Sequence, residues 1–249
     1  MYKIPINSKK RYGSTKTMQI LHKNGFPKIS LGRVSRLMKQ LGIRSIVIRK
    51  FKHYSQRISR FGTFDNLVNR QFFASKPNQI WLSDITYIHT VKHGWTYLAS
   101  ILDVCTRKIV GFHFARKMDK NLVISTLEKA SHNQSYPTDV ILHSDRGSQY
   151  TSTDYLEKAK KLGMKLSYSK KGCPFDNAPI ESFHASLKKE EVYLKHYSDF
   201  NDVRISLFSC IEGFYNRNRI HSAINFLSPI EFEKVFFLML ILTLLCPIY

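Results

Sequence analysis

The amino-acid sequence predicts an α/β fold, in which strands and helices alternate around one core. Three observations favour this class. Three aromatic and β-branched segments follow one another across short turns, as strands do. Helix-type and strand-type patterns then alternate further along the chain. The composition, with 43% hydrophobic and 13% aromatic residues among 249, is typical of a globular chain large enough to bury a sizeable core.

The first three predicted strands form a meander. Their sequences are QIWLSDITYI (79–88), WTYLASILDV (95–104) and KIVGFHFA (108–115). DVILHSD (139–145) is a fourth strand, and its short apolar run is typical of the centre of a sheet. The other predicted elements are a helix at 119–133 capped by Asp119, a helix at 154–163, a strand at 164–169, and helices at 178–190 and 200–216.

Residues 1–60 form a basic helical segment and linker. The sequence SLGRVSRLMKQLG (30–42) predicts a helix that begins at the N-cap Ser30 and carries apolar side chains at helical spacing. A weaker helix at 15–23 precedes it, so a helix-turn-helix arrangement is expected. The opposite face carries Arg33, Arg36 and Lys39, which are either DNA contacts or a merely solvated basic face.

The charge of the chain points to a polyanionic partner. Lys and Arg number 39 against 18 Asp and Glu, a net charge of +21, and nucleic acid is the first candidate. The four cysteines form no CxxC pair, which argues against a zinc ribbon and favours a reducing, cytoplasmic compartment.

The segment 235–249 (VFFLMLILTLLCPIY) is an apolar tail. Its 15 residues are fewer than the roughly 20 that a membrane-spanning helix needs, so no membrane partner is expected. The alternatives to a membrane anchor are a buried terminal helix or strand, or a tail that is not part of the original gene.

Three acidic residues stand where a sheet of this kind can bring them together. Asp84 lies within the first strand, Asp145 at the end of the fourth, and Glu181 near the start of the helix at 178–190. Taken singly, such residues more often cap turns or interact favourably with the dipole at a helix N-terminus. Two carboxylates about 4 Å apart repel by roughly 4 kcal/mol at an effective dielectric of 20, so a converging set needs a cation. Carboxylate ligands suit Mg²⁺ or Mn²⁺, and two such ions catalyse phosphoryl displacement.

Several motifs together resemble a known family. WLSDITYI, LDVCTRKIVGF, HSDRGSQYTS, GCPFDNAPIESFHASLKKE and FYNRNRIHSAINFLSP resemble, in order and spacing, the integrase-core transposases of bacterial insertion sequences. The chain is most similar to the second-frame protein of the insertion sequence 3 family, of the DDE superfamily. The 35 residues between Asp145 and Glu181 match the D(35)E spacing of that group. The resemblance covers about 60–230.

The resemblance implies both a fold and a reaction. It implies a ribonuclease H-like core at 61–234, with a five-stranded mixed sheet flanked by helices. It also implies that Asp84, Asp145 and Glu181 are ligands of two Mg²⁺ or Mn²⁺ ions. It implies cleavage at the ends of the element and transfer of the 3′-OH into DNA. It also implies a homo-oligomer on DNA, cooperation or fusion with an upstream-frame protein, and a nucleoid-associated location in the bacterial cytoplasm.

The neighbours of the three carboxylates have narrower roles. Lys188 lies two helical turns after Glu181 on the same face and is predicted to contact a DNA phosphate, as are Lys170 and Lys171 in the basic loop. A structural hydrogen bond is favoured for His143 over a role as a base.

Two alternative functions remain open at this point. One is a ribonuclease H-like nuclease that cuts without strand transfer. The other is a catalytically inactive, DNA-binding remnant of a transposase. The extended motifs favour strand transfer over the first, and the three intact carboxylates argue against the second.

Overall fold

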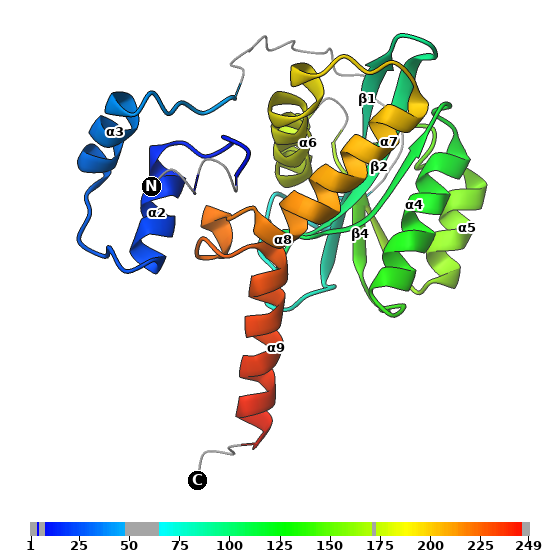
Figure 1. Cartoon of the computed structure of the whole chain (residues 1–249). Coiled ribbons are helices and arrows are strands. Elements are labelled where there is room, and N and C mark those ends of the chain that lie inside the picture. The colour runs from blue at the N-terminus through cyan, green and yellow to red at the C-terminus, as the bar shows by residue number, and fades with distance from the viewer. Residues whose placement is uncertain (1–3, 5–7, 48–64, 171–172, 246–249) are drawn as a thin grey trace. The chain divides into compact units, whose positions relative to one another are not determined.

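The computed structural model describes residue 4 and residues 8–47, 65–170 and 173–245. It divides into two compact units, residues 1–50 with 212–249 and residues 51–211. The second unit contains a five-stranded sheet (Figure 1). Its strands are β1 (Ile80–Thr90), β2 (Gly94–Asp103), β3 (Ile109–Ala115), β4 (Ile141–Ser144) and β5 (Lys165–Tyr168).

The sheet is mixed and has the order β3-β2-β1-β4-β5. The predicted meander is confirmed, because β1, β2 and β3 pair antiparallel in succession. β4 lies parallel to β1, with Ile80 opposite Ile141 and Leu82 opposite His143, and β5 lies parallel to β4. β1 is therefore the central strand, and β4, which carries the segment before Asp145, is its direct neighbour.

Helices cover the two faces of the sheet (Figure 1). On one face, α4 (Lys120–Asn133) and α5 (Thr153–Lys161) bury Trp81, Leu127 and Leu142 in the main hydrophobic core. The Asp119 side chain caps α4, as predicted, by accepting a hydrogen bond from the Leu122 backbone nitrogen. On the other face, α6 (Ala178–Glu190), which carries Glu181, packs against β1 and β2.

One close approach in the core requires a glycine. Gly111 of β3 lies against Ala130 of α4, and a Cβ at position 111 would stand 2.6 Å from the Ala130 Cβ and 2.7 Å from its backbone nitrogen. Because the second of these is a main-chain atom, the neighbour cannot give way by a rotamer change. Because Gly111 has no side chain, α4 can pack this closely on the sheet.

The predicted helix at 200–216 is not one regular α-helix. α7 (Phe200–Phe208) begins at a capping box in which Asp199 accepts from Asn201 and Asp202, and a π-helix follows at Ser209–Tyr215. The wider π turn shifts the phase of the side chains along the helix. The predicted apolar positions are nevertheless all buried: Val203, Leu207, Cys210, Ile211 and Phe214.

The other unit contains the predicted N-terminal helices. α2 (Ser14–Lys23) and α3 (Leu31–Gln40) contact each other, and Ser30 caps α3 by accepting from the Arg33 backbone nitrogen, as expected. Val34 and Met38 are buried in a cluster that includes Phe214 and Ile220. The Tyr12 hydroxyl donates to the Asn218 carbonyl over 2.7 Å. Two segments far apart in the sequence thus form one small core.

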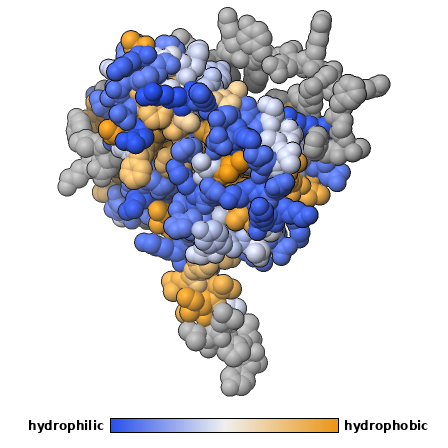
Figure 2. Space-filling view, turned by 90° about the vertical axis from the view of Figure 1, so that its right-hand side faces the viewer, coloured by the Kyte–Doolittle hydropathy of each residue, from blue (hydrophilic) through white to orange (hydrophobic). Residues whose placement is uncertain are grey.

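The apolar tail is part of a longer helix, α9 (Pro229–Leu245). Its side chains are exposed at Val235 and from Phe237 to Leu242, and Figure 2 shows the apolar surface that results. Among the described residues, no helix combines the length and the hydropathy that a membrane span requires. Of the alternatives that the sequence left open, a terminal helix is present, but it is not buried at these residues.

We predict that Gly111→Ala lowers the free energy of unfolding by about 1–3 kcal/mol, the usual cost of overpacking a close-packed core. Urea denaturation followed by circular dichroism measures this change. The control is Gly32→Ala on α3, where an added Cβ meets nothing within 4 Å, so the change should stay within about 1 kcal/mol. Equal stability of both variants would mean that α4 is not held as closely as the structure indicates.

Candidate active site

Asp84 occupies the middle of the central strand. It lies opposite Ser100 of β2, with its side chain 23% exposed on the face covered by α6. Strand residues alternate between the two faces of a sheet, so Asp84 points away from the face that buries Trp81. The pleat of β1 therefore directs one acidic side chain toward the helix that carries Glu181.

His184 of α6 holds the Asp84 carboxylate. The His184 Nδ1 lies 3.1 Å from Asp84 Oδ2, and its Nε2 lies 3.3 Å from the Ser100 hydroxyl. The buried imidazole therefore links α6 to β1 through Asp84 and to β2 through Ser100. The sequence analysis did not single out His184, although its position three residues after Glu181 places it on the same helical face.

Asp145 follows β4 directly and is held by its own turn. Its Oδ1 accepts a hydrogen bond from the Gly147 backbone nitrogen over 2.9 Å. The side chain reaches the surface, but the protein around the carboxyl displaces water, which raises its pKa. The Gly147 hydrogen bond lowers that pKa and the charge of Asp84 raises it, with a net rise. A Cβ at Gly147 would lie 3.0 Å from this oxygen, so position 147 accommodates the carboxylate because it is a glycine.

Glu181 lies in the first turn of α6 and is half-buried. Burial, and to a lesser degree the charges of Asp84 and Asp145, together raise its pKa from an ordinary value of 4.5 to about 7. The three predicted acidic residues are therefore close enough to act on one another electrostatically. Their joint role as metal ligands stays a prediction.

Polar contacts below the site join its parts. The Asn177 amide, at the start of α6, donates to the Ser83 carbonyl over 3.1 Å, and the Ser83 hydroxyl lies 3.0 Å from the Tyr150 hydroxyl. The Tyr168 hydroxyl donates in turn to the Tyr150 carbonyl. Asn177 occupies the N-cap position of α6, but its side chain makes no capping hydrogen bond and binds the central strand instead.

His143 and Asp176 have structural roles. The buried His143 ring lies 2.8 Å from the Ser167 hydroxyl and 3.0 Å from that of Ser169, so both ring nitrogens have partners on or next to β5. Burial lowers the pKa of His143. Asp176 accepts from Arg70 Nε over 2.6 Å and from the Lys170 backbone nitrogen. The favoured structural interpretation of His143 is confirmed.

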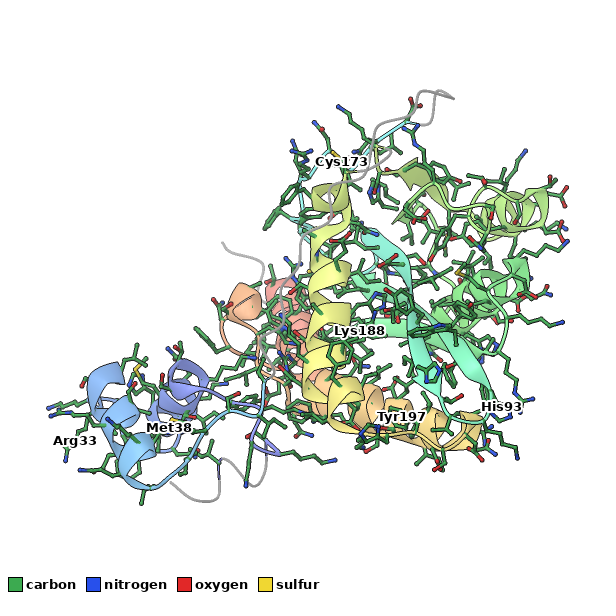
Figure 3. The ribbon with its side chains drawn as sticks, turned by 90° about the horizontal axis from the view of Figure 1, so that it is seen from above. Arg33, Met38, His93, Cys173, Lys188 and Tyr197 are labelled. Carbon is green, nitrogen blue, oxygen red and sulfur yellow. The ribbon has the colours of Figure 1, made fainter. Side chains whose placement is uncertain are left out.

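Lys188 stands between the acidic residues and an aromatic ring. Its ammonium lies 4.0 Å from the centroid of the Tyr87 ring, and the side chain is half-buried. Figure 3 shows Lys188 on α6, on the side of that helix nearest the sheet. Burial lowers the pKa of Lys188, and the charge of Asp84 acts in the opposite direction.

The other basic residues predicted to contact DNA lie at the surface. Arg33, Arg36 and Lys39 are exposed on α3, and Lys170 is exposed just after β5. Lys171 lies outside the described residues. An exposed basic side chain is available to a phosphate, which is a necessary condition for the predicted role.

The site suits a divalent cation in its chemistry. Carboxylate oxygens are the ligands that Mg²⁺ and Mn²⁺ prefer. The pKa values of Asp145 and Glu181 are raised, first by burial and then by the charges of the neighbouring carboxylates, so a cation beside them would be favourable. Among the described residues, no three His, Cys, Asp or Glu side chains are already grouped so that they could hold a metal ion. The donor set therefore fits the ion by its chemistry.

The part of the chain that holds Asp84, Asp145 and Glu181 is similar to the integrase-core class of proteins. An integrase core domain model matches residues 74–174, and a second such model matches residues 162–229. An HTH-like domain model matches residues 1–51.

Similar proteins define the family more narrowly. Transposase InsF for insertion sequence IS3A of Escherichia coli (strain K12) is 38% identical over 227 residues, which cover 91% of this chain and 78% of that protein. The transposase for insertion sequence element IS904 of Lactococcus lactis subsp. lactis (strain IL1403) is also 38% identical over 227 residues, with 91% and 88% covered. The chain belongs to the IS3 family of transposases, and its catalytic part is a DDE-type polynucleotidyl transferase.

Solved structures show a more distant likeness. The HTLV-2 integrase catalytic core domain in complex with magnesium is 16% identical, with a TM-score of 0.49 over 65% of this chain and 99% of that one. The catalytic domain of Mos1 mariner transposase is 13% identical, with a TM-score of 0.44 over 55% of this chain and 71% of that one.

The raised pKa of Glu181 predicts how stability depends on pH in the metal-free protein. Because the folded-state pKa of about 7 lies above the ordinary 4.5, the folded state binds the proton more tightly. This contribution to stability is fully present below pH 4.5 and is lost as the pH rises through 7. Glu181→Gln should therefore be more stable than the unaltered chain at pH 8, by about 1–2 kcal/mol after allowance for solvent screening, and equally stable near pH 4.

Thermal unfolding at both pH values, in the presence of a chelator, measures the difference. The matched control is Glu157→Gln on α5, whose side chain is exposed, and it should show the pH profile of the unaltered chain. Parallel profiles for the unaltered chain and Glu181→Gln would contradict the mutual repulsion of the three carboxylates.

Proposed function

We propose that this chain is the catalytic subunit that cuts the ends of an insertion sequence and joins the freed 3′-OH to target DNA, with Asp84, Asp145 and Glu181 as its catalytic residues. The observation that carries the proposal is their electrostatic coupling across two strands and one helix. Membership of the IS3 family supports the reaction type. A solvated surface carboxylate would not show such coupling, because water would screen it.

The three residues would hold Mg²⁺ or Mn²⁺, in a pair of sites. Such ions, when bound, make the attacking oxygen a better nucleophile and stabilise the charge that develops on the phosphate. The residues of the chain supply the positions: His184 fixes one oxygen of Asp84, and the Gly147 backbone nitrogen fixes one oxygen of Asp145. The half-buried Glu181 exists partly as the neutral acid near pH 7, so the ions must displace its proton.

DNA would be held by basic side chains at two places. Arg33, Arg36 and Lys39 share the exposed face of α3, within the region matched by the HTH-like model. Lys188 lies within electrostatic range of Asp84, and Lys170 and Lys171 precede α6 in the sequence. We assign the first group to DNA recognition and the others to phosphates near the reacting bond.

The proposed joining of two DNA ends implies which partners the chain needs. Two element ends must be cut and joined together, so the working form is a homo-oligomer on DNA. An upstream-frame protein or a fusion with it would assist in locating the ends, and the DNA of a bacterial nucleoid would be the setting. An inactive DNA-binding remnant and a nuclease without strand transfer are the competing outcomes of the tests below.

The first test of the proposal uses Asp145→Asn. This variant should lower metal-dependent cleavage and joining of labelled element-end DNA by about 100-fold or more, because it removes a charged ligand but keeps the shape of the residue. DNA binding should remain nearly intact. The matched control is Asp154→Asn on α5, an exposed aspartate whose partner is Lys120, and it should keep full activity.

The assay runs with Mg²⁺ or Mn²⁺, with and without the upstream-frame protein. Joined product that is lost in Asp145→Asn supports the proposed strand transfer. Cleavage without joining in every arm would favour the nuclease, and DNA binding without cleavage would favour the inactive remnant. Full activity of Asp145→Asn would remove this residue from the catalytic set.

A second test concerns the basic face of α3. If six to ten phosphates are contacted, DNA affinity should fall by about 10³–10⁵ between 50 and 200 mM salt. The triple variant Arg33→Ala, Arg36→Ala, Lys39→Ala should reduce the slope of log affinity against log salt by about 2–3. Lys160→Ala with Lys161→Ala on the exposed side of α5 is the control and should leave the slope nearly unchanged. An equal effect of both variants would mean that α3 has no special role in recognition.

A further inference from the structure

Three ring-bearing side chains form an exposed platform on the hairpin of β1 and β2. Tyr87 and His89 come from β1, and Trp95 comes from β2. The Trp95 ring centroid lies 5.1 Å from that of Tyr87 and 5.1 Å from that of His89, edge to face in both cases. Tyr87 is 56% exposed and Trp95 is 55% exposed. We call Tyr87, His89 and Trp95 the hairpin platform.

The platform contributes little to the core of the fold. By alternation its side chains belong to the same face of the sheet as Trp81, but they are exposed and are not among the residues of the main hydrophobic core. The alternate residues of this stretch, Thr86, Ile88 and Thr90, are buried instead. Exposure of three adjacent rings to water is unfavourable in the free protein. An exposed aromatic surface of this kind is therefore typical of a binding site.

Lys188 connects the hairpin platform to the catalytic carboxylates. Its ammonium lies 4.0 Å from the Tyr87 ring centroid and also within electrostatic range of Asp84. A single cation therefore lies at the border between the acidic site and the rings. At the other end of the hairpin, Lys92 and His93 lie close to Asp199, so their charge is partly balanced. The positive charge that distinguishes the platform comes from Lys188.

The length of β1 fits a nucleotide strand. Asp84 and Tyr87 are three residues apart, or about 10 Å along β1 at roughly 3.3 Å per residue, and they point to opposite faces of the strand. β4 pairs with β1 over Ile80–Leu82, before either residue, and Lys188 lies near both, so a strand of DNA would pass round this edge of β1 beside Lys188. Nucleotides of a duplex repeat at about 3.4 Å and unpaired ones are at least as extended, so a phosphate at the carboxylates leaves bases a few nucleotides away beside Tyr87 and Trp95. Rings next to a cation are the usual surface for unpaired bases, because every base has a π-face that can stack.

We propose that the hairpin platform binds unpaired nucleotides of the DNA strand whose phosphate lies at the carboxylates. The inference rests on the proposed function for the position of that phosphate. Paired bases cannot stack on these rings without leaving the duplex, so the platform selects DNA ends that are frayed or carry an overhang. The occupant is single-stranded DNA, in keeping with the net charge of +21, and a protein partner is an outcome that the test detects.

Trp95 serves as the reporter in the test. The chain has two tryptophans, and the other, Trp81, is fully buried, so quenching by added DNA reports on Trp95. The probes are a blunt duplex and the same duplex with a short thymidine overhang, both in chelator so that no cleavage occurs. We expect quenching with the overhang probe and little with the blunt one.

The variants then separate stacking from general binding. Trp95→Ala should weaken binding of the overhang probe by about 10–100-fold, or roughly 1.4–2.8 kcal/mol, with blunt-duplex affinity unchanged, and Trp95→Phe should recover most of the loss. Phe208→Ala on α7, which removes another exposed aromatic ring, is the matched control and should change neither affinity. Thermal unfolding of each variant checks that it is folded.

The inference fails if Trp95→Ala weakens both probes equally, or neither. A change in oligomeric state in Trp95→Ala, with DNA affinities unchanged, would assign the platform to a second copy of the chain and also overturn the inference. The binding test contains no metal, so it is independent of catalysis. If the overhang is bound preferentially but the metal-dependent assay gives no strand transfer, the proposed function is wrong and the inference about the hairpin platform stands.

Discussion

The repulsion among three carboxylates is the constraint on which the rest of the catalytic unit depends. Asp84, Asp145 and Glu181 come from different parts of the chain, and each would be better hydrated alone in water. The fold holds them together, and the raised pKa of Glu181 shows the energetic cost of doing so without a cation. A divalent ion would remove that cost, so metal binding and stability of the site are coupled.

Rigid connections make this arrangement possible. Asn177 joins the start of α6 to the Ser83 carbonyl on the central strand, and Ser83 contacts Tyr150 after β4. His184 then links Asp84 to α6 from the other side. Asp84 and Asp145 are thus positioned by hydrogen bonds that do not depend on the other carboxylates, as preorganised sites require, while Glu181 is positioned by its place in the first turn of α6.

The same central strand relates the acidic site to the hairpin platform. Asp84 points to the face under α6, while Tyr87 and Trp95 stand exposed farther along the hairpin. Lys188 lies near both groups and balances part of the negative charge. A polyanionic strand can therefore approach carboxylates that would repel it, since cations and rings hold its neighbouring nucleotides.

The sequence by itself determined the order of strands and helices, the Asp119 and Ser30 caps, and the identity of the three acidic residues, because periodicity, capping preferences and motif spacing are local properties. It did not predict the π turn after α7, the contact of His184 with Asp84, or the exposure of Tyr87 and Trp95. These features depend on packing between elements: Asn177 stands at the N-cap position of α6, yet its side chain binds a strand 94 residues away. Tertiary structure decided them because a side chain's partner is set by what the fold places opposite it, which no local pattern contains.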